Sequence, residues 1–339
     1  MICSSRQHPM FQSFRALLPW LFFVSATLAL GACDGANDPL APAEDPLTVA
    51  AQPEPSNSVA SGDALALTTG QRIVFTSTRN GGYDIYKMDP QGNNVAPLAT
   101  SADLEFAPAW SYDNKRVALG RPRQDALHYY HYDIWLVNAD GTNGHWARTN
   151  PFPYDLYYPS WPPSGTRLVL NVAMSGAMYV GWMDLVTGQV GVFSTVGGGL
   201  QGQQPSYSPT GQQIVYVGAT GKTIDRINAD GSAHKTLVSS TNLLSQPALS
   251  PDGKKLVFVK TTGVNLDIFV KSFADGVTKR LTTWASDDYH PSWSPDGSKI
   301  AFTSSRSGQP QIWTMSATGG SPTRITHTST AERDPAWSH

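Results

Sequence analysis

Short runs that alternate hydrophobic and polar positions recur along the chain from residue 71 onward. Runs at 255–259 and 299–303 are rich in β-branched and aromatic residues, and each follows a Ser-Pro-Asp-Gly turn. Third runs occur at 84–86, 133–135, 267–269 and 311–313, and Asp-Gly pairs follow at 140–141, 230–231 and 275–276. Alternation predicts half-buried strands, and Asp-Gly is a strong hairpin signal because its glycine adopts positive φ. The pattern therefore predicts an all-β chain of short antiparallel strands.

A longer repeat organises these strands. A proline is followed two residues later, in most copies, by an aromatic residue and then by a serine. The six prolines are Pro108, Pro159, Pro205, Pro247, Pro291 and Pro335. Their mean spacing of about 45 residues is the length expected of a four-stranded propeller blade. Six copies predict a ring of six blades and 24 strands.

The two ends of the repeat region predict how the ring closes. The region enters a blade at its second strand, 72–76, and finishes on a first strand, 334–338. The last strand should therefore complete the first blade, which removes exposed sheet edges. We expect residues 71–339 to form an all-β six-bladed β-propeller of four-stranded antiparallel blades.

The repeat resembles that of a known group of propellers. The pattern Pro-x-Trp-Ser-Pro-Asp-Gly-x-x-Ile-Ala-Phe-x-Ser-x-Arg-x-Gly is nearly complete at 291–308 and is echoed at 75–81. It looks like the WD40-like repeat of the TolB-type propellers, and the resemblance covers about 269 of 339 residues. It implies the propeller fold, whereas its blades serve unrelated functions. TolB itself is a soluble periplasmic protein with an α/β domain before the propeller, and here a different segment takes that place.

The first 32 residues have the pattern of a lipoprotein signal peptide. Arg6 and Arg15 precede a 17-residue, mostly apolar run at 16–32, which is shorter than a membrane-spanning helix needs. The run ends in Leu-Gly-Ala before Cys33, which resembles the bacterial lipobox. Cys33 is thus the expected lipid-attachment site. Ordinary secretion with an incidental Cys33 is the alternative.

Residues 33–70 are expected to form an acidic, disordered tether behind that cysteine. Residues 34–70 contain six acidic residues, five prolines and no Lys or Arg, and such a segment buries too little apolar surface to fold. Asp34 follows Cys33 directly, a pattern that favours inner-membrane retention in enteric lipoproteins. Residues 71–339 hold 22 basic and 20 acidic residues, a formal net charge of +2. We therefore expect an envelope protein, monomeric and without a nucleic-acid partner.

Candidate binding residues fall in the longer, more varied loops. In a blade, the loops between strands two and three and between successive blades lie on one face, opposite the Pro-Asp-Gly and Asp-Gly turns. The candidates for a partner-binding face are Tyr129, Tyr130, Tyr154, Tyr157, Asp287, Asp288 and Tyr289. Exposed aromatic residues beside charges are typical of binding surfaces. Packing of the tyrosines loop against loop over the channel mouth is an equally weighted alternative.

Other chemistry is less well supported by the sequence. His128, His131 and His290 could bind a divalent metal, but solvated or loop-packing histidines explain the spacing more simply. Asp287 and Asp288 are expected to be a solvated pair. Arg79 and Arg306 occupy matching places in two blades and should pair with neighbouring acids such as Asp84. The sequence contains no Gly-x-Ser-x-Gly nucleophile motif.

Two functions remain open at this point. The first is a membrane-anchored, non-catalytic envelope lipoprotein that binds a protein or glycan partner through its variable-loop face and needs no cofactor. The alternative is a polysaccharide-active enzyme, a uronate lyase or hydrolase with a metal at the channel mouth. That alternative comes from similar propellers that degrade uronates with a histidine-bound metal.

Overall fold

A computed structural model describes residues 70–125, 129–149, 154–195 and 198–339. The signal peptide, Cys33, Asp34, the tether through residue 69 and His128 lie outside the described residues, so the expectations for them stay predictions. Every regular element in the described residues is a strand. Accordingly, this part of the chain contains no helix long and apolar enough to cross a membrane.

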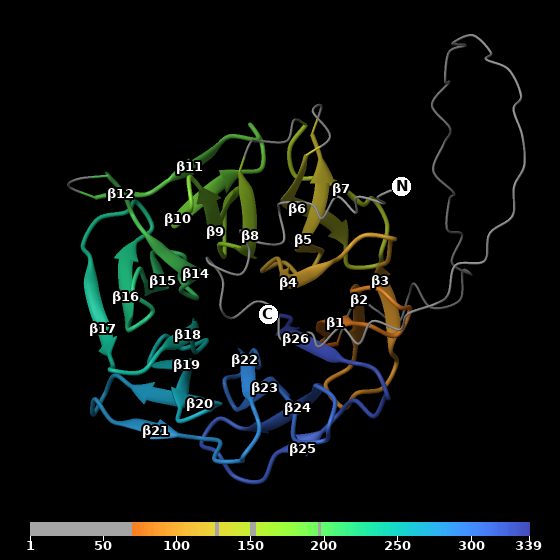
Figure 1. The fold of residues 1–339 in the computed structure, drawn as a ribbon, viewed down its shortest axis with the longest axis vertical. Helices are drawn as coiled ribbons and strands as arrows, with labels where there is room; N and C mark the ends of the chain where they lie inside the picture. Colours follow the sequence, from red (N-terminus) through yellow and green to blue (C-terminus); the bar gives the residue numbers. More distant parts are fainter. Residues whose placement is uncertain (1–69, 126–128, 150–153, 196–197) are drawn as a thin grey trace, which may run out of the picture. The chain divides into compact units, whose positions relative to one another are not determined.

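The strands form six four-stranded antiparallel sheets around a centre (Figure 1). Blade one consists of β26 (Glu332–Trp337), β1 (Ile73–Ser77), β2 (Asp84–Met88) and β3 (Ala96–Ala99). Blade two consists of β4 (Phe106–Trp110), β5 (Arg116–Gln124), β6 (Tyr130–Asn138) and β7 (His145–Trp146). Blade three consists of β8 (Asp155–Ser160), β9 (Arg167–Met174), β10 (Ala177–Asp184) and β11 (Val190–Val192).

The remaining blades repeat this order. Blade four consists of β14 (Gly202–Tyr207), β15 (Gln213–Gly218), β16 (Thr223–Asn228) and β17 (Lys235–Ser239). Blade five consists of β18 (Leu244–Leu249), β19 (Lys255–Thr262), β20 (Asn265–Ser272) and β21 (Thr278–Arg280). Blade six consists of β22 (Asp288–Trp293), β23 (Lys299–Ser304), β24 (Gln311–Ser316) and β25 (Thr323–Arg324). The first strand of each blade faces the centre of the ring (Figure 1).

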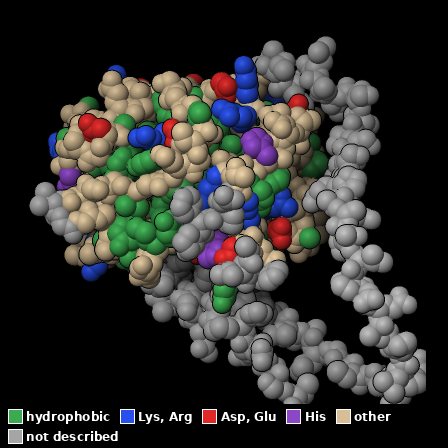
Figure 2. Space-filling view, turned by 90° about the horizontal axis from the view of Figure 1, so that it is seen from above, with side chains coloured by type: hydrophobic (Ala, Val, Ile, Leu, Met, Phe, Trp, Pro, Cys, Tyr) green, Lys and Arg blue, Asp and Glu red, His purple; other side chains and the backbone are tan. Residues whose placement is uncertain are grey.

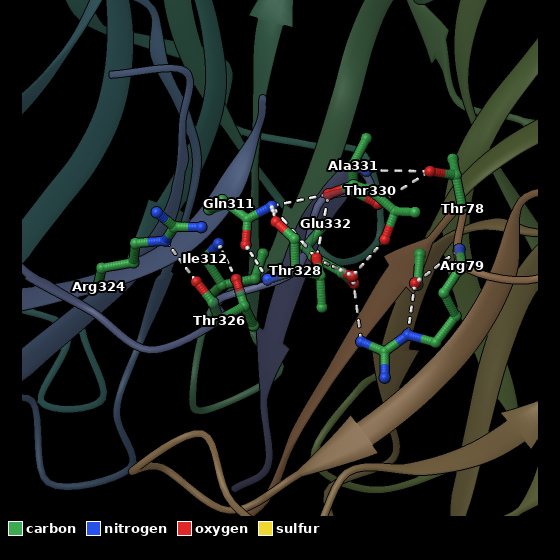
Figure 3. Close-up of polar contacts among 11 residues, drawn as sticks. Thr78, Arg79, Gln311, Ile312, Arg324, Thr326, Thr328, Thr330, Ala331 and Glu332 are labelled. Carbon is green, nitrogen blue, oxygen red and sulfur yellow. Dashed lines mark hydrogen bonds and ion pairs between the residues drawn. The ribbon is translucent and has the colours of Figure 1, made fainter. Parts of the chain in front are cut away.

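The last strand closes the ring, as the sequence predicts. β26 pairs antiparallel with β1, with Ile73 opposite Trp337 and Val74 opposite Ala336. Figure 3 shows the polar side of this seam, where the Ala331 amide donates to the Thr78 hydroxyl at 3.0 Å. The prediction of a closed six-bladed propeller is confirmed.

Where the Ser-Pro-Asp-Gly motif follows the first strand of a blade, it forms and stabilises the turn into the second strand. In blade six, the Ser294 hydroxyl donates to Asp296 Oδ1 at 2.6 Å and accepts the Lys299 amide at 2.9 Å. The hydrogen bond from Ser294 is the main cause that lowers the pKa of Asp296 to about 2. Gly297 ends the turn with φ of 68°, a region that favours glycine. The turn chemistry seen in the sequence thus has a direct structural cause.

The core lies between neighbouring blades. The Trp293 indole packs beside Val257, Val259 and Phe302, and its Nε1 donates to the Ala248 carbonyl of blade five at 3.1 Å. Full burial of each such apolar side chain contributes about 1.5–3 kcal/mol. The aromatic residue of the repeat therefore serves blade packing.

Two details differ from the sequence prediction. The described residues contain a two-stranded ribbon, β12 (Ser194–Thr195) and β13 (Gly198–Gly199), in addition to the 24 blade strands. The ribbon lies in the connection between blades three and four, where the blade pattern predicts a plain loop. Arg79 pairs with Glu332 of β26 at 3.1 Å, so the expected pair with Asp84 is wrong. Ring closure brings Glu332, 253 residues away, beside Arg79.

Candidate functional site: the channel ring and the loop face

The innermost strand of every blade bulges at its repeat proline. The residues just before the six prolines all have positive φ, at 50–55°: Ala107, Tyr158, Gln204, Gln246, His290 and Asp334. This conformation is uncommon for residues other than glycine, and a following proline favours extended backbone instead. The antiparallel register shifts in each first strand. The bulge is therefore a property of the repeat, and we call these six residues the channel ring.

The channel ring lines a central cavity of about 220 Å³. The six repeat prolines and small neighbours such as Ala109 and Ser160 complete its wall. Each ring residue falls within the first four residues of its strand, at the end nearest the longer loops. The cavity is thus placed where the channel meets the loop face.

Hydrogen bonds join consecutive ring residues across blade boundaries. The Gln246 amide donates to Gln204 Oε1, and the His290 amide donates to Gln246 Oε1, both at 2.7 Å. The Gln204 amide donates to Asn171 Oδ1, also at 2.7 Å. These contacts fix the orientation of the two Gln carboxamides.

A charged pair continues the ring. His290 Nδ1 pairs with Asp334 Oδ1, and the Thr76 hydroxyl donates to Asp334 Oδ2 at 3.2 Å. Burial opposes ionisation of Asp334, but the facing imidazole of His290 and the nearby Arg333 outweigh it and lower the pKa of Asp334. Burial raises the pKa of the Tyr158 phenol, and the charge of Asp334 adds to the rise. The ring therefore holds a neutral phenol beside a compensated carboxylate.

Three consecutive blades carry a buried acid three residues before the repeat proline. Arg306 Nη2 lies 2.9 Å from both carboxylate oxygens of Asp288, whose side chain is fully buried. In blade one, Glu332 pairs with Arg79, as Figure 3 shows. In blade two, Glu105 Oε1 lies 3.9 Å from Arg121 Nε, and burial raises the pKa of Glu105 to about 7.

Aromatic rings cover these arginines. The Arg306 guanidinium lies 4.9 Å from the Trp284 ring centroid and 4.8 Å from that of Trp313. Arg79 lies 4.4 Å above Tyr86, and Arg121 lies 4.5 Å above Trp135. Such stacking holds a planar guanidinium in place. The acid, arginine and aromatic units stiffen this part of the loop face.

The predicted partner-binding residues divide by exposure. Tyr129 and Tyr130 are 57% and 54% exposed at the end of the β5–β6 hairpin. Tyr154, Asp287 and Tyr289 are partly buried, and Asp287 Oδ1 accepts the Leu266 amide at 2.9 Å.

Tyr157 and Asp288 are buried, so the expectation that they are exposed on loops is wrong. Strands β8 and β22 begin at Asp155 and Asp288, earlier than the sequence pattern suggests. Tyr157 consequently packs against Tyr132, with ring centroids 5.3 Å apart. Asp288 is held by Arg306, so the predicted solvated acid pair does not form.

Of the three histidines considered as metal ligands, the structure describes His131 and His290. His131 lies between two carboxylates of the loop face, 3.4 Å from Asp125 Oδ2 and 3.7 Å from Asp155 Oδ1. His290 belongs to the channel ring of blade six. Within the described ranges, no group of three or more His, Cys, Asp or Glu residues could hold a metal ion. Because His128 lies outside the described residues, the metal site considered from the sequence stays a prediction.

Sequence reasoning overlooked most of the channel ring and Trp284. Trp284 is 55% exposed in the loop between β21 and β22. A signal for the ring was present, because the residue before each repeat proline varies between Ala, Tyr, Gln, His and Asp, whereas the two residues after it are always Pro and then Ala or Ser. The side chains of this variable position meet only after the ring has closed.

Comparisons with known proteins agree with this architecture. Residues 233–339 match PD40, the TolB beta propeller domain. A TolB homolog from Chlorobium luteolum is 29% identical over 168 residues, which are 38% of this chain and 38% of that protein. The matched region thus spans well under half the length of that relative.

Solved structures extend the likeness to the whole ring. TolB from Acinetobacter baumannii superposes with a TM-score of 0.67 at 22% identity, over 80% of this chain and 67% of that one. An oligogalacturonate lyase in complex with manganese superposes with a TM-score of 0.53 at 16% identity, over 76% and 74%. By its fold, this protein is thus a six-bladed β-propeller protein. More specifically, the chain carries a TolB-like propeller.

Proposed function

We propose that this protein is a non-catalytic binding scaffold of the bacterial cell envelope. In this proposal, a lipid on Cys33 anchors the chain, and residues up to 70 tether the propeller to the membrane. Asp34 favours the inner membrane. The loop face then presents the channel mouth and its surrounding aromatic side chains to a protein or glycan partner.

Three exposed aromatic side chains are the observation that carries the proposal. Tyr129, Tyr130 and Trp284 are each more than half exposed on the loop face. Large aromatic side chains are enriched in binding surfaces because they bury much area with few rotatable bonds. Figure 2 views the ring from its edge and shows basic and acidic side chains interspersed there. Residues 71–339 carry a formal net charge of only +2, so we expect aromatic contacts, more than a field of one sign, to hold the partner.

Envelope pull-down experiments with the full-length protein test the proposal. The test variant carries Tyr129→Ala, Tyr130→Ala and Trp284→Ala, and bound proteins are quantified by mass spectrometry. A matched control carries Val186→Ala and Val277→Ala, which are 77% and 58% exposed at turns of the opposite face. We expect the test variant alone to lose a partner, by at least about tenfold if these residues are hot spots. If the wild type, the test variant and the control recovered every partner equally, the loop face would not be the binding surface.

The enzymatic alternative has a separate readout. Incubation of the protein with acidic oligosaccharides, with and without added Mn²⁺, should leave the oligosaccharides intact. The appearance of unsaturated or shortened products would replace the scaffold by a polysaccharide-active enzyme. The likeness to the lyase shows the fold alone and does not favour that outcome.

A further inference from the structure

At the channel-ring position, the residue type varies from blade to blade. In every blade the next residue is proline, and the one after it is Ala or Ser. Those positions are restricted because the innermost strands approach one another there: the Ser292 hydroxyl, for example, accepts the Trp337 amide at 2.9 Å. The ring position has the same φ in all six blades but holds five different residue types. Blade architecture accounts for the side-chain oxygens of Gln204 and Gln246, which accept amides of the next blade, but not for the other polar groups of the ring.

Several polar groups of the ring have capacity left for a ligand. Gln246 uses Oε1 for the His290 amide, and no contact in the described structure engages its Nε2, which has two N–H donors. The Tyr158 hydroxyl accepts a hydrogen bond from the Gln204 side chain and keeps its own proton to donate. Since His290 Nδ1 faces Asp334, its Nε2 remains available on the other edge of the ring. A ligand would meet an amide donor, a phenol and an imidazole nitrogen in one cavity.

The charges of the site are already balanced. Asp334 is the acidic member of the ring, and His290 and Arg333 offset its charge. Tyr158 is neutral near pH 7, as any phenol is, and burial raises its pKa further. Asp334 would repel an anionic ligand, and a cationic ligand would compete with His290 for Asp334. The electrostatics therefore favour an uncharged ligand.

The size and wall of the cavity narrow the ligand further. Its volume of about 220 Å³ equals roughly seven waters at about 30 Å³ each. Six prolines and the methyl groups of Ala107, Ala109 and Ala248 give apolar patches between the polar groups. A compact ligand with hydroxyls at its edge and C–H groups on its faces matches both features, because a hydroxyl donates and accepts in turn.

We infer that the channel ring binds a neutral sugar ring, with Gln246 Nε2, the Tyr158 hydroxyl and His290 Nε2 contacting its hydroxyls. The sugar comes either as a free monosaccharide or as one residue of an envelope glycan. This inference deepens the proposed binding function and rests on it.

Saturation-transfer NMR on the full-length protein tests the inference. The probes are glucose, galactose and N-acetylglucosamine, each at millimolar concentration, with galacturonate as a charged comparator. Two variants remove donors with little change of shape: Tyr158→Phe, and Gln246→Glu, which keeps an oxygen for the His290 amide. The matched control is Tyr112→Phe, whose ring stacks on His339 in the β4–β5 turn of the opposite face. Thermal unfolding of each variant confirms that it is folded.

We expect at least one neutral sugar to bind, and each ring variant to weaken that sugar's binding about fivefold to tenfold. Tyr112→Phe should bind the sugar as the wild type does. The sugar that binds is then compared with a tetrasaccharide built from it. Equal affinity indicates that the natural ligand is a free monosaccharide, and tighter binding of the tetrasaccharide indicates that it is an envelope glycan.

Three results would overturn the inference: no neutral sugar binds, galacturonate binds more tightly than every neutral sugar, or binding survives both ring variants. The ring variants leave Tyr129, Tyr130 and Trp284 in place. Loss of sugar binding with intact partner recovery, or the reverse, therefore separates this inference from the proposed scaffold.

Discussion

The two halves of the propeller fill one repeat position in opposite ways. Three residues before the repeat proline, blades six, one and two carry Asp288, Glu332 and Glu105. Blades three, four and five carry Leu156, Gly202 and Leu244 at that place. The two leucines are at most 3% exposed and the acids at most 1%. Both halves therefore bury the position, either with apolar packing or with a paired charge.

The comparison shows what a buried acid requires in this fold. Desolvation of a carboxylate is costly, and only a well-placed cation compensates for it. Asp288 and Glu332 have arginines at matching places in their blades, whereas Glu105 depends on Arg121 from another position and at a longer distance. In blade four, the Tyr216 ring would lie 2.6 Å from an added Cβ at Gly202, so no side chain fits there.

The largest expected effect comes from breaking the closest pair. Asp288→Ala leaves Arg306 without its carboxylate, and Arg306 is only 6% exposed. We expect the free energy of unfolding to fall by about 3–5 kcal/mol, measured by denaturant unfolding. The double variant Asp288→Leu with Arg306→Leu copies the apolar half and should unfold within about 1 kcal/mol of the wild type. If Asp288→Ala lowered the free energy of unfolding by less than about 1 kcal/mol, the buried Arg306 would not depend on the Asp288 carboxylate.

The next effect is a dependence of stability on pH caused by Glu105. Its folded pKa of about 7 lies above the ordinary value of 4.5, so the folded state favours the protonated acid. Its contribution to stability is therefore fully present below pH 4.5 and is lost as the pH rises through 7. At about 1.4 kcal/mol per pKa unit, the loss is about 3.5 kcal/mol.

Glu105→Gln should remove this loss. We expect the variant to match the wild type at low pH and to be the more stable protein at pH 8, in denaturant unfolding at several pH values. Asp288→Asn is the comparison variant. Arg306 lies 2.9 Å from the Asp288 carboxylate, so replacing this carboxylate by an amide should destabilise the protein. Parallel stability curves for the wild type and Glu105→Gln would contradict a raised pKa of Glu105.

The smallest expected effect is a difference in stability between two variants, Trp293→Phe and Trp337→Phe, at equivalent positions in neighbouring blades. Trp293 Nε1 donates to Ala248 O, whereas Trp337 Nε1 is buried without a partner in the described structure. Both changes to Phe lose similar packing, but Trp293→Phe also loses a hydrogen bond. We expect it to cost about 1 kcal/mol more than Trp337→Phe in thermal unfolding. Equal costs would show that the indole hydrogen bond adds nothing measurable.

The sequence predicted the blades well because their signals are local and repeated. Ser294, Asp296 and Gly297 act within one turn, so their spacing alone indicates a hairpin. The site was harder to predict. Asp288 was placed on an exposed loop because the sequence does not show that β22 begins there and that Arg306 covers it.

By itself, the sequence determined the strand pattern, the number of blades, the closing strand and the near-neutral charge of the propeller. These depend on neighbouring residues and on a period of about 45 residues. Only the tertiary structure decided that Arg79 pairs with Glu332 and that Tyr158, Gln246 and His290 share one cavity. Those residues lie in different blades, and closure of the ring, rather than any local pattern, sets the distances between them.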